Sequence, residues 1–141
     1  MRRDNARTCR RILVVEDDPD LAEVLEELFR TAGYEPSVAN DGPAALARAA
    51  AFLPEIVLLD IHMLTVDGYE LCTRLASQPN RAFRIVALTG DVRIDEAQAR
   101  GAGFDGLLLK PIDFERALQL LDQLELAGAP GAAAPAAYLS A

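Results

Sequence analysis

Short apolar runs and amphipathic segments alternate along this chain. Residues 12–15 form a β-branched run, after which apolar residues recur at helical spacing from Leu21 to Phe29 until Gly33. The same alternation is repeated four more times. It predicts strands at 12–15, 37–39, 56–59, 85–88 and 107–109, and later helices at 43–52, 69–76, 95–101 and 114–126.

Five strand–helix units of this kind indicate an α/β fold. Nearly continuous apolar strands, each followed by a helix, favour a parallel sheet that is covered on both faces, because crossover connections are right-handed. We therefore expect a doubly wound five-stranded parallel sheet, (βα)5 and flavodoxin-like, with strand order 2-1-3-4-5. Residues 11–127 would form this domain, residues 1–10 an arginine-rich arm, and residues 128–141 an Ala/Pro/Gly-rich tail or linker.

Polar residues interrupt the predicted strands at their carboxyl ends. Glu16 and Asp17 follow the first strand, Asp60 the third, Thr89 the fourth and Lys110 the fifth. In a parallel sheet these ends share one edge, and open α/β sheets bind ligands there, where the strand order reverses. The first and third strands flank that point, so Glu16, Asp17 and Asp60 should converge.

Three neighbouring carboxylates repel one another unless a cation compensates their charge. Oxygen ligands of this kind suit Mg²⁺, which keeps several waters and bridges to phosphate oxygens. Lys110 would add a compact cation beside Asp60, and Thr89 a hydroxyl donor. Together these groups would neutralise the charge of a phosphoryl group in transfer.

The residues at this edge form motifs that resemble those of response-regulator receiver domains, from Arg11 to about Leu126. Their order and spacing are more specific than any one of them. The matching segments are Val14-Val15-Glu16-Asp17-Asp18, Val57-Leu58-Leu59-Asp60, Asp67-Gly68-Tyr69-Glu70, Ala87-Leu88-Thr89-Gly90 and Leu109-Lys110-Pro111.

The resemblance implies a role for each residue of the edge. Asp60 is the phosphorylated aspartate and a metal ligand, Asp17 a direct Mg²⁺ ligand, and Glu16 a ligand through water. The backbone carbonyl of His62 is expected to complete the metal site. Thr89 would bond a phosphoryl oxygen, and Lys110 would pair with the phosphoryl group.

Three positions depart from the family pattern. Leu64 stands where proline is frequent, and Gly90 where alanine is common. Leu107, three residues before Lys110, occupies a position where many receivers carry an aromatic or histidine side chain that rotates on activation. The resemblance therefore leaves open how a signal passes from the phosphorylation site to a partner.

Each candidate also has a simpler interpretation. Asp60 could be a turn or capping residue. The acidic run that begins at Glu16 could act only by stabilising the amino terminus of the first helix. Lys110 could be a surface lysine, and Thr89 a residue selected for strand propensity. A side-chain role for His62, the only histidine, would require an orienting partner that the sequence does not identify.

Composition limits the remaining classes of function. The chain has a net charge of −8, which disfavours non-specific binding of nucleic acid. No run of apolar residues is long enough for a membrane span, and the polar arginine-rich start argues against a secretory signal, so we expect the cytoplasm. Cys9 and Cys72 are two isolated thiols and predict no disulfide framework or zinc site.

The sequence thus predicts a phosphoacceptor receiver domain of a two-component phosphorelay. A sensor or hybrid histidine kinase, or a histidine phosphotransfer protein, would phosphorylate Asp60 and so change binding to an output protein. We expect no turnover on a separate substrate, only self-catalysed phosphorylation and dephosphorylation. The alternatives are a phosphorylation-independent interaction module of the same fold and a Mg²⁺-dependent aspartyl-phosphate phosphatase.

Overall fold

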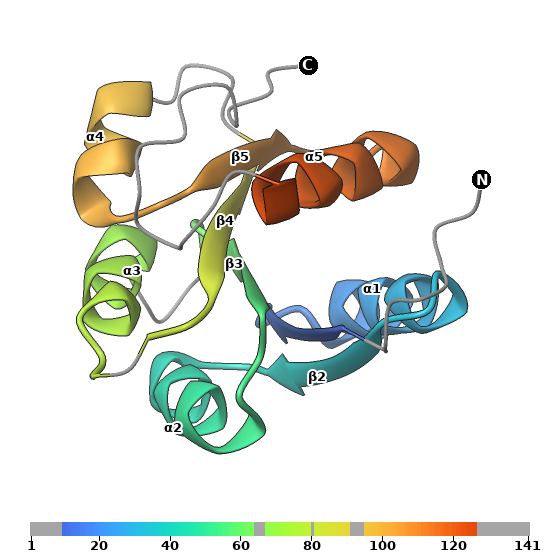
Figure 1. The fold of residues 1–141 in the computed structure, drawn as a ribbon, viewed down its shortest axis with the longest axis horizontal. Coiled ribbons are helices and arrows are strands. Elements are labelled where there is room, and N and C mark those ends of the chain that lie inside the picture. The colour runs from blue at the N-terminus through green and yellow to red at the C-terminus, as the bar shows by residue number, and fades with distance from the viewer. Residues whose placement is uncertain (1–9, 64–66, 80, 91–94, 127–141) are drawn as a thin grey trace.

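Strands and helices alternate without exception along the described part of the chain (Figure 1). A computed structural model describes residues 10–63, 67–79, 81–90 and 95–126. The strands are β1 (Arg11–Val15), β2 (Glu35–Ala39), β3 (Ile56–Asp60), β4 (Arg84–Thr89) and β5 (Gly106–Leu109). The helices are α1 (Pro19–Thr31), α2 (Gly42–Phe52), α3 (Gly68–Ala76), α4 (Glu96–Ala102) and α5 (Phe114–Leu126).

The strands form one parallel sheet in the order β2-β1-β3-β4-β5, which confirms the predicted fold class and strand order. The register aligns the carboxyl ends of the central strands. Val15 of β1 lies opposite Leu59 of β3, and Asp60 lies opposite Leu88 of β4. The order reverses between β1 and β3, where the acidic residues were expected to meet.

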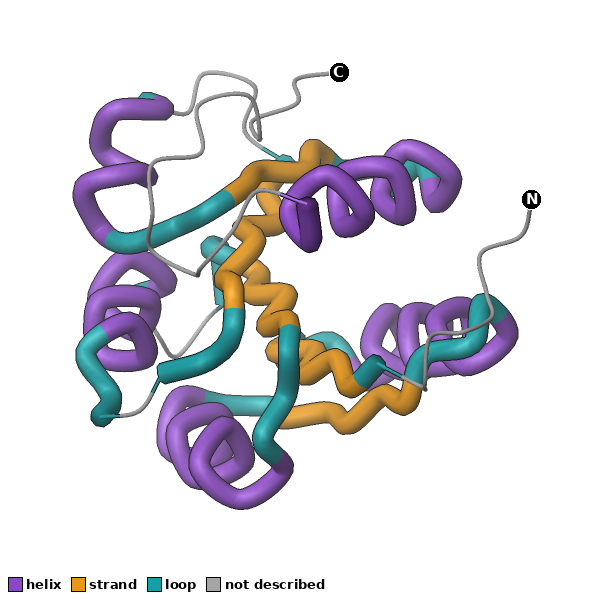
Figure 2. The backbone as a smooth tube through the Cα atoms, viewed as in Figure 1, coloured by secondary structure: helices purple, strands orange, loops and turns teal. Residues whose placement is uncertain are grey.

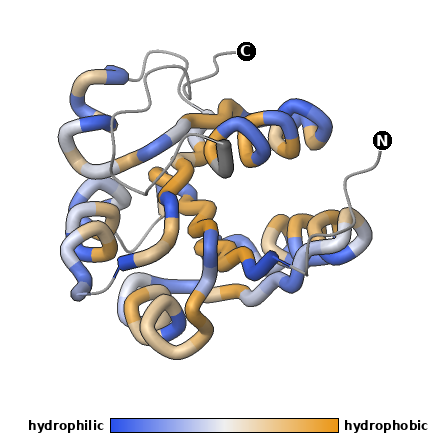
Figure 3. Tube along the Cα trace, viewed as in Figure 1, coloured by the Kyte–Doolittle hydropathy of each residue, from blue (hydrophilic) through white to orange (hydrophobic). Residues whose placement is uncertain are grey.

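Helices cover both faces of the sheet. In Figures 1 and 2, α2, α3 and α4 lie on one side of the strands, and α1 and α5 on the other. Alternate residues of each strand belong to two separate hydrophobic cores. Leu13 and Val15 lie in the first, and Ile12 and Val14 in the second. The hydropathy colouring of Figure 3 shows the apolar residues concentrated in the strands.

An aspartate side chain caps the start of every helix in the described ranges. Asp18, for example, accepts a hydrogen bond from the backbone N–H of Asp20 at 3.0 Å. Such caps satisfy the N–H groups that have no partner within the helix, and a carboxylate also suits the positive end of the helix dipole. The other caps are Asp41, Asp67, Asp95 and Asp113.

Several predicted boundaries are shifted by one or two residues. β2 begins at Glu35 because Arg11 and Glu35 already pair across the sheet, although neither is apolar. The helix predicted at 95–101 is Glu96–Ala102, because Asp95 is its cap. On α1, Val24 and Leu28 were expected on the apolar face, but their exposed fractions are 53% and 38%. The apolar stripe of α1 is therefore wider than the surface that it buries.

The predicted N-terminal arm contributes one described residue, Arg10. Its guanidinium donates to the Tyr34 hydroxyl at 2.8 Å and forms an ion pair with Asp122 of α5 at 3.2 Å. Arg10 is therefore packed against the domain. Residues 1–9, Leu64 and the predicted tail at 128–141 lie outside the described residues. Among the described helices, none has the length and apolar character needed to cross a membrane.

Candidate functional site

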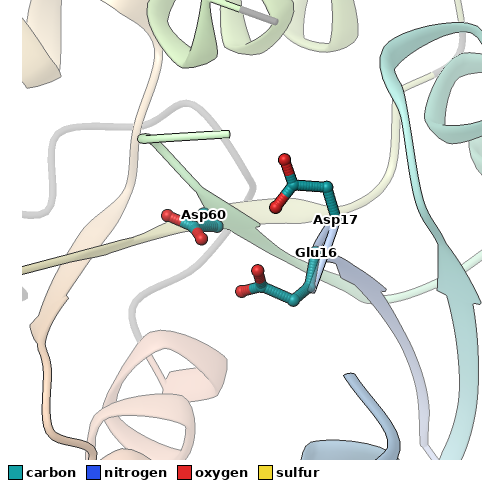
Figure 4. Close-up of side chains that lie close together, drawn as sticks. All are labelled: Glu16, Asp17 and Asp60. Carbon is teal, nitrogen blue, oxygen red and sulfur yellow. The ribbon is translucent and has the colours of Figure 1, made fainter. Parts of the chain in front are cut away.

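The ends of β1 and β3 bring three carboxylates together. One carboxylate oxygen from each of Glu16, Asp17 and Asp60 lies within 4.8 Å of the others. Figure 4 shows the three side chains gathered at this edge of the sheet. Glu16 and Asp60 are 2% and 3% exposed, and Asp17 is half-buried. The convergence follows from parallel pairing, because the register places the residues after Val15 and Leu59 side by side.

Glu16 is fixed by hydrogen bonds, but one of its oxygens accepts none in the part of the chain that the structure describes. Its backbone N–H donates to the carbonyl of Ala39, and its Oε2 accepts from the N–H of Asp18 at 3.1 Å. Its Oε1 is buried and accepts no hydrogen bond within the described residues. Burial, followed by the neighbouring Asp60 carboxyl, raises the pKa of Glu16 from 4.5 to about 7.

Each carboxylate oxygen of Asp60 has a hydrogen-bond partner. Its Oδ1 accepts from the backbone N–H of His62 at 3.0 Å, and its Oδ2 lies 3.1 Å from Lys110 Nζ. Lys110 is 4.0 Å from the Oε1 of Glu16. The hydrogen bond from the His62 N–H is what we would expect if Asp60 were only a turn residue. The ion pair across 50 residues of sequence is not explained by a turn, and it brings a cation to the acidic cluster.

The other predicted residues have different environments. Thr89 ends β4 with 0% exposure, and its carbonyl accepts from the N–H of Lys110 at 2.8 Å. The His62 side chain is exposed, so its only described link to the cluster is the backbone bond to Asp60. Asp18 caps α1, so the helix interpretation of the acidic run holds for this residue. The proposed contacts of the Thr89 hydroxyl and the His62 carbonyl stay predictions.

The donor set of this cluster fits a small hard cation. Three carboxylates from two strand ends face one another with Lys110 as the one cation placed against them in the described part of the chain. Burial and the hydrogen bond from Asp18 fix the position of the Glu16 carboxylate. Its Oε1 accepts no hydrogen bond in the described residues and could therefore coordinate a cation. Oxygen donors in this number, without histidine or thiolate, match Mg²⁺ better than a softer metal.

Two residues shape the site in ways that the sequence analysis did not state: it does not mention Asn40, and it quotes Gly68 only as part of a motif. Asn40 follows β2 at the same edge, and its side chain donates to the backbone carbonyl of Glu16 at 3.1 Å. Gly68 begins α3 against the backbone of Ile61, the residue after Asp60: a Cβ at Gly68 would lie 2.6 Å from Ile61 Cα. Asn40 could have been found by applying the strand-end argument to β2 as well.

Comparison with known proteins places this geometry in a family. The family model described as the response regulator receiver domain matches residues 12–122. The chain belongs to the response regulator receiver domain family. This receiver domain is 43% identical over 105 residues to the response regulator PleD of Caulobacter vibrioides, which covers 73% of the chain and 23% of PleD. It is 34% identical to the DNA-binding regulator RpaA of Synechocystis, over 77% of the chain and 46% of RpaA.

Solved structures agree with the fold of this receiver domain. A putative response regulator from Chloroflexus aurantiacus superposes with a TM-score of 0.75 at 30% identity, covering 83% of this chain and 98% of that one. The response regulator TrrA of Thermotoga maritima, in complex with Mg²⁺ and BeF, gives 0.73 at 28% identity, covering 82% and 98%. The chain thus spans less than half of PleD and RpaA but nearly all of these receiver structures.

Proposed function

We propose that Asp60 accepts a phosphoryl group and that this modification is the signal carried by the domain. The observation that supports the proposal most strongly is the position of Asp60: it is 3% exposed, 3.1 Å from Lys110 and within 4.8 Å of two further carboxylates. Burying a carboxylate beside two other acids is unfavourable, so an aspartate without a function is not expected at such a site. The family membership of the chain agrees with this role.

The reaction transfers the phosphoryl group from a histidine of the partner kinase or phosphotransfer protein. An Oδ atom of Asp60 attacks phosphorus, a P–O bond forms, and the P–N bond breaks as the imidazole leaves with its electron pair. The His62 N–H, which donates to Oδ1, keeps the carboxylate oriented. Lys110, now paired with Oδ2, would move its charge to the incoming phosphoryl oxygens.

Glu16, Asp17 and Asp60 would hold Mg²⁺ beside this carboxylate, with the His62 carbonyl as the fourth protein ligand inferred from the family. The cation supplies positive charge that offsets both the carboxylates and the phosphoryl oxygens. TrrA was solved with Mg²⁺ and BeF, and a similar site here rests on the acidic cluster and the unbonded Oε1 of Glu16.

Self-catalysed phosphorylation and dephosphorylation, without turnover on a separate substrate, is the extent of the chemistry we propose. The aspartyl-phosphate phosphatase alternative calls for a second acid two residues after the acceptor, where this chain has His62 with an exposed side chain. The output partner is a protein whose affinity depends on the phosphorylation state. RpaA is named a DNA-binding regulator, but DNA binding by this chain of net charge −8 is not part of the proposal.

Intact-mass measurement with acetyl phosphate tests the proposal. Wild-type protein should gain one phosphoryl group with Mg²⁺ and essentially none when the metal is chelated. Asp60→Asn should gain none. Asp20→Asn is the matched control, because Asp20 is an exposed aspartate in the first turn of α1 and should leave labelling unchanged. Equal labelling of wild type and Asp60→Asn would refute the assignment.

A further inference from the structure

Asn40, directly after β2, supports the backbone of the acidic cluster without contributing a carboxylate to it. Its side-chain Nδ2 donates to the backbone carbonyl of Glu16 at 3.1 Å. A carbonyl oxygen can only accept, so the amide nitrogen and not the amide oxygen has to face it. The Glu16 N–H in turn donates to the carbonyl of Ala39 at 3.0 Å. Consecutive residues at the end of β2 therefore hold both the N–H and the C=O of Glu16.

The Asn40 side chain supplies a donor that the backbone does not provide at this point of the sheet. The last paired residues of β1 and β2 are Val15 and Ala39. Because Glu16 donates to Ala39, the next bond of a parallel ladder would run from the N–H of Asp41 to the Glu16 carbonyl. No such bond is present in the described part of the chain, where Asp41 is the cap of α2. The Asn40 side chain thus extends the ladder by one bond, to a residue of the acidic cluster.

The Glu16 carbonyl belongs to the peptide group that joins Glu16 to Asp17. This group is planar, so the Cα and carbonyl of Glu16 and the N and Cα of Asp17 move together. A hydrogen bond to the carbonyl fixes the orientation of the plane and so the directions in which both side chains leave the backbone. Figure 4 shows the two side chains leaving adjacent positions beside Asp60. One bond from Asn40 therefore acts on two of the three carboxylates.

Neither core packing nor helix capping explains Asn40. The residue is exposed, so it adds little to the hydrophobic cores. The start of α2 has its own cap, because the Oδ1 of Asp41 accepts from the N–H of Ala44 at 2.8 Å. The hydrogen bond described for the Asn40 side chain leads to the acidic cluster. Its position therefore relates to the phosphorylation site.

We propose that Asn40 is a positioning residue, which holds the Glu16–Asp17 peptide so that both carboxylates stay beside Asp60 for Mg²⁺ binding. The inference rests on the proposed function and concerns the affinity for the metal, not the attack on phosphorus. Without a cation the three carboxylates repel one another, and a peptide group free to rotate would let two of them move away. The bond orders the ligands before the cation arrives, which reduces the cost of binding.

Calorimetric titration of the metal-free protein with Mg²⁺ tests the proposal. Asn40→Ala should raise the dissociation constant for Mg²⁺ about threefold to tenfold, because the hydrogen bond that orients two ligands is lost. Gln78→Ala is the matched control. Gln78 also carries an amide, whose Nε2 donates to the backbone carbonyl of Leu46 at 3.2 Å, and it lies near Glu55, at the amino-terminal edge of the sheet. This variant should keep the wild-type dissociation constant.

Phosphorylation by acetyl phosphate separates positioning from chemistry. Asn40→Ala should require more Mg²⁺ for half-maximal labelling, by the same factor as the change in dissociation constant. Its loss of rate at saturating Mg²⁺ should be much smaller, because Asp60 and Lys110 keep their contact. Gln78→Ala should change neither quantity. In urea without metal, both variants should lose a small and comparable amount of stability, since each loses one bond from an amide to the backbone.

Wild-type protein offers a measurement that needs no variant. If the bond to Glu16 is kept in solution, the exposed side-chain amide of Asn40 should be as rigid as the backbone in the metal-free protein. Nitrogen relaxation should then give this amide an order parameter of about 0.85. A value below about 0.6 would show that the bond is not maintained and would overturn the proposal.

The titrations distinguish failure of this inference from failure of the proposed function. Equal Mg²⁺ dissociation constants for wild type and Asn40→Ala would overturn the positioning role and leave the role of Asp60 intact. Equal weakening in Asn40→Ala and Gln78→Ala would overturn it as well, because the effect would then follow from lost stability. Absence of Mg²⁺ binding by the wild-type protein would instead refute the proposed function, and this inference with it.

Discussion

Replacing Gly68 with alanine should destabilise the receiver domain, because no space exists for a Cβ at this position. Gly68 is buried at the start of α3, directly after the cap Asp67. An added Cβ would lie 2.6 Å from Ile61 Cα, 2.7 Å from its carbonyl oxygen and 3.0 Å from its carbonyl carbon. All three atoms belong to the backbone, so no change of side-chain rotamer can relieve the contact.

The size of the effect follows from the displacement that is needed. The contact must open from 2.6 Å to the 3.4 Å of an ordinary van der Waals contact, so α3 or the backbone at Ile61 must move by about 0.8 Å. Overpacking of this kind costs about 1–3 kcal/mol. Because Ile61 follows Asp60 directly, the same movement should disturb the bond from His62 to Asp60 and slow phosphorylation.

Urea denaturation and phosphorylation rates measured on the same variant test this reasoning. Gly101→Ala is the matched control: Gly101 lies in α4, an added Cβ would meet no atom within 4 Å beyond its chain neighbours and the nearby backbone of its own helix, and alanine there should gain up to about 1 kcal/mol. If Gly68→Ala is as stable as wild type, the close approach of α3 to Ile61 does not exist in solution. Loss of stability with an unchanged phosphorylation rate would separate the fold from the site.

Mg²⁺ affinity should fall as the pH drops below about 7, because protons compete with the cation for Glu16, whose pKa is raised to about 7. Calorimetry across this range should show the dependence flattened in Glu16→Gln. Burial raises the pKa of the Cys72 thiol to about 12, so in a Cys9→Ser background thiol reagents should label the protein only after unfolding, and rapid native labelling would contradict this. Leu107→Ala should lose about 2–5 kcal/mol of unfolding free energy, because Leu107 is 1% exposed in the core beneath α4, whereas Val24→Ala, at a 53% exposed position, should change little.

The acidic site could be predicted because it depends on periodicity and topology. Apolar runs locate the strands, parallel pairing aligns their carboxyl ends, and the reversal of strand order selects β1 and β3. Glu16, Asp17 and Asp60 then have to meet, and Lys110 at the end of β5 is close enough to reach Asp60. No pairwise distance had to be known in advance.

The opposite edge of the sheet could not be predicted in this way. Nothing in the local sequence distinguishes Arg81 from Arg84. The folded chain shows that Asp105, 24 residues from Arg81, pairs with Arg81, whereas the terminal nitrogens of Arg84 have no hydrogen-bond partner among the described residues. The requirement for glycine at position 68 likewise depends on the path of the backbone at Ile61. The local pattern of apolar and polar residues locates the ends of the strands, but it does not predict contacts between residues that are distant in the sequence.

Direct mapping of the phosphorylated residue tests the central claim most sharply. Borohydride reduces an acyl phosphate and converts the modified aspartate to homoserine, which peptide sequencing by mass spectrometry can locate. After treatment with acetyl phosphate and Mg²⁺, we expect homoserine at position 60 and unmodified aspartate at Asp17 and Asp18. Homoserine at either of those positions with Asp60 intact, or phosphorylation that leaves no homoserine at all, would contradict the assignment of Asp60 as the phosphoacceptor.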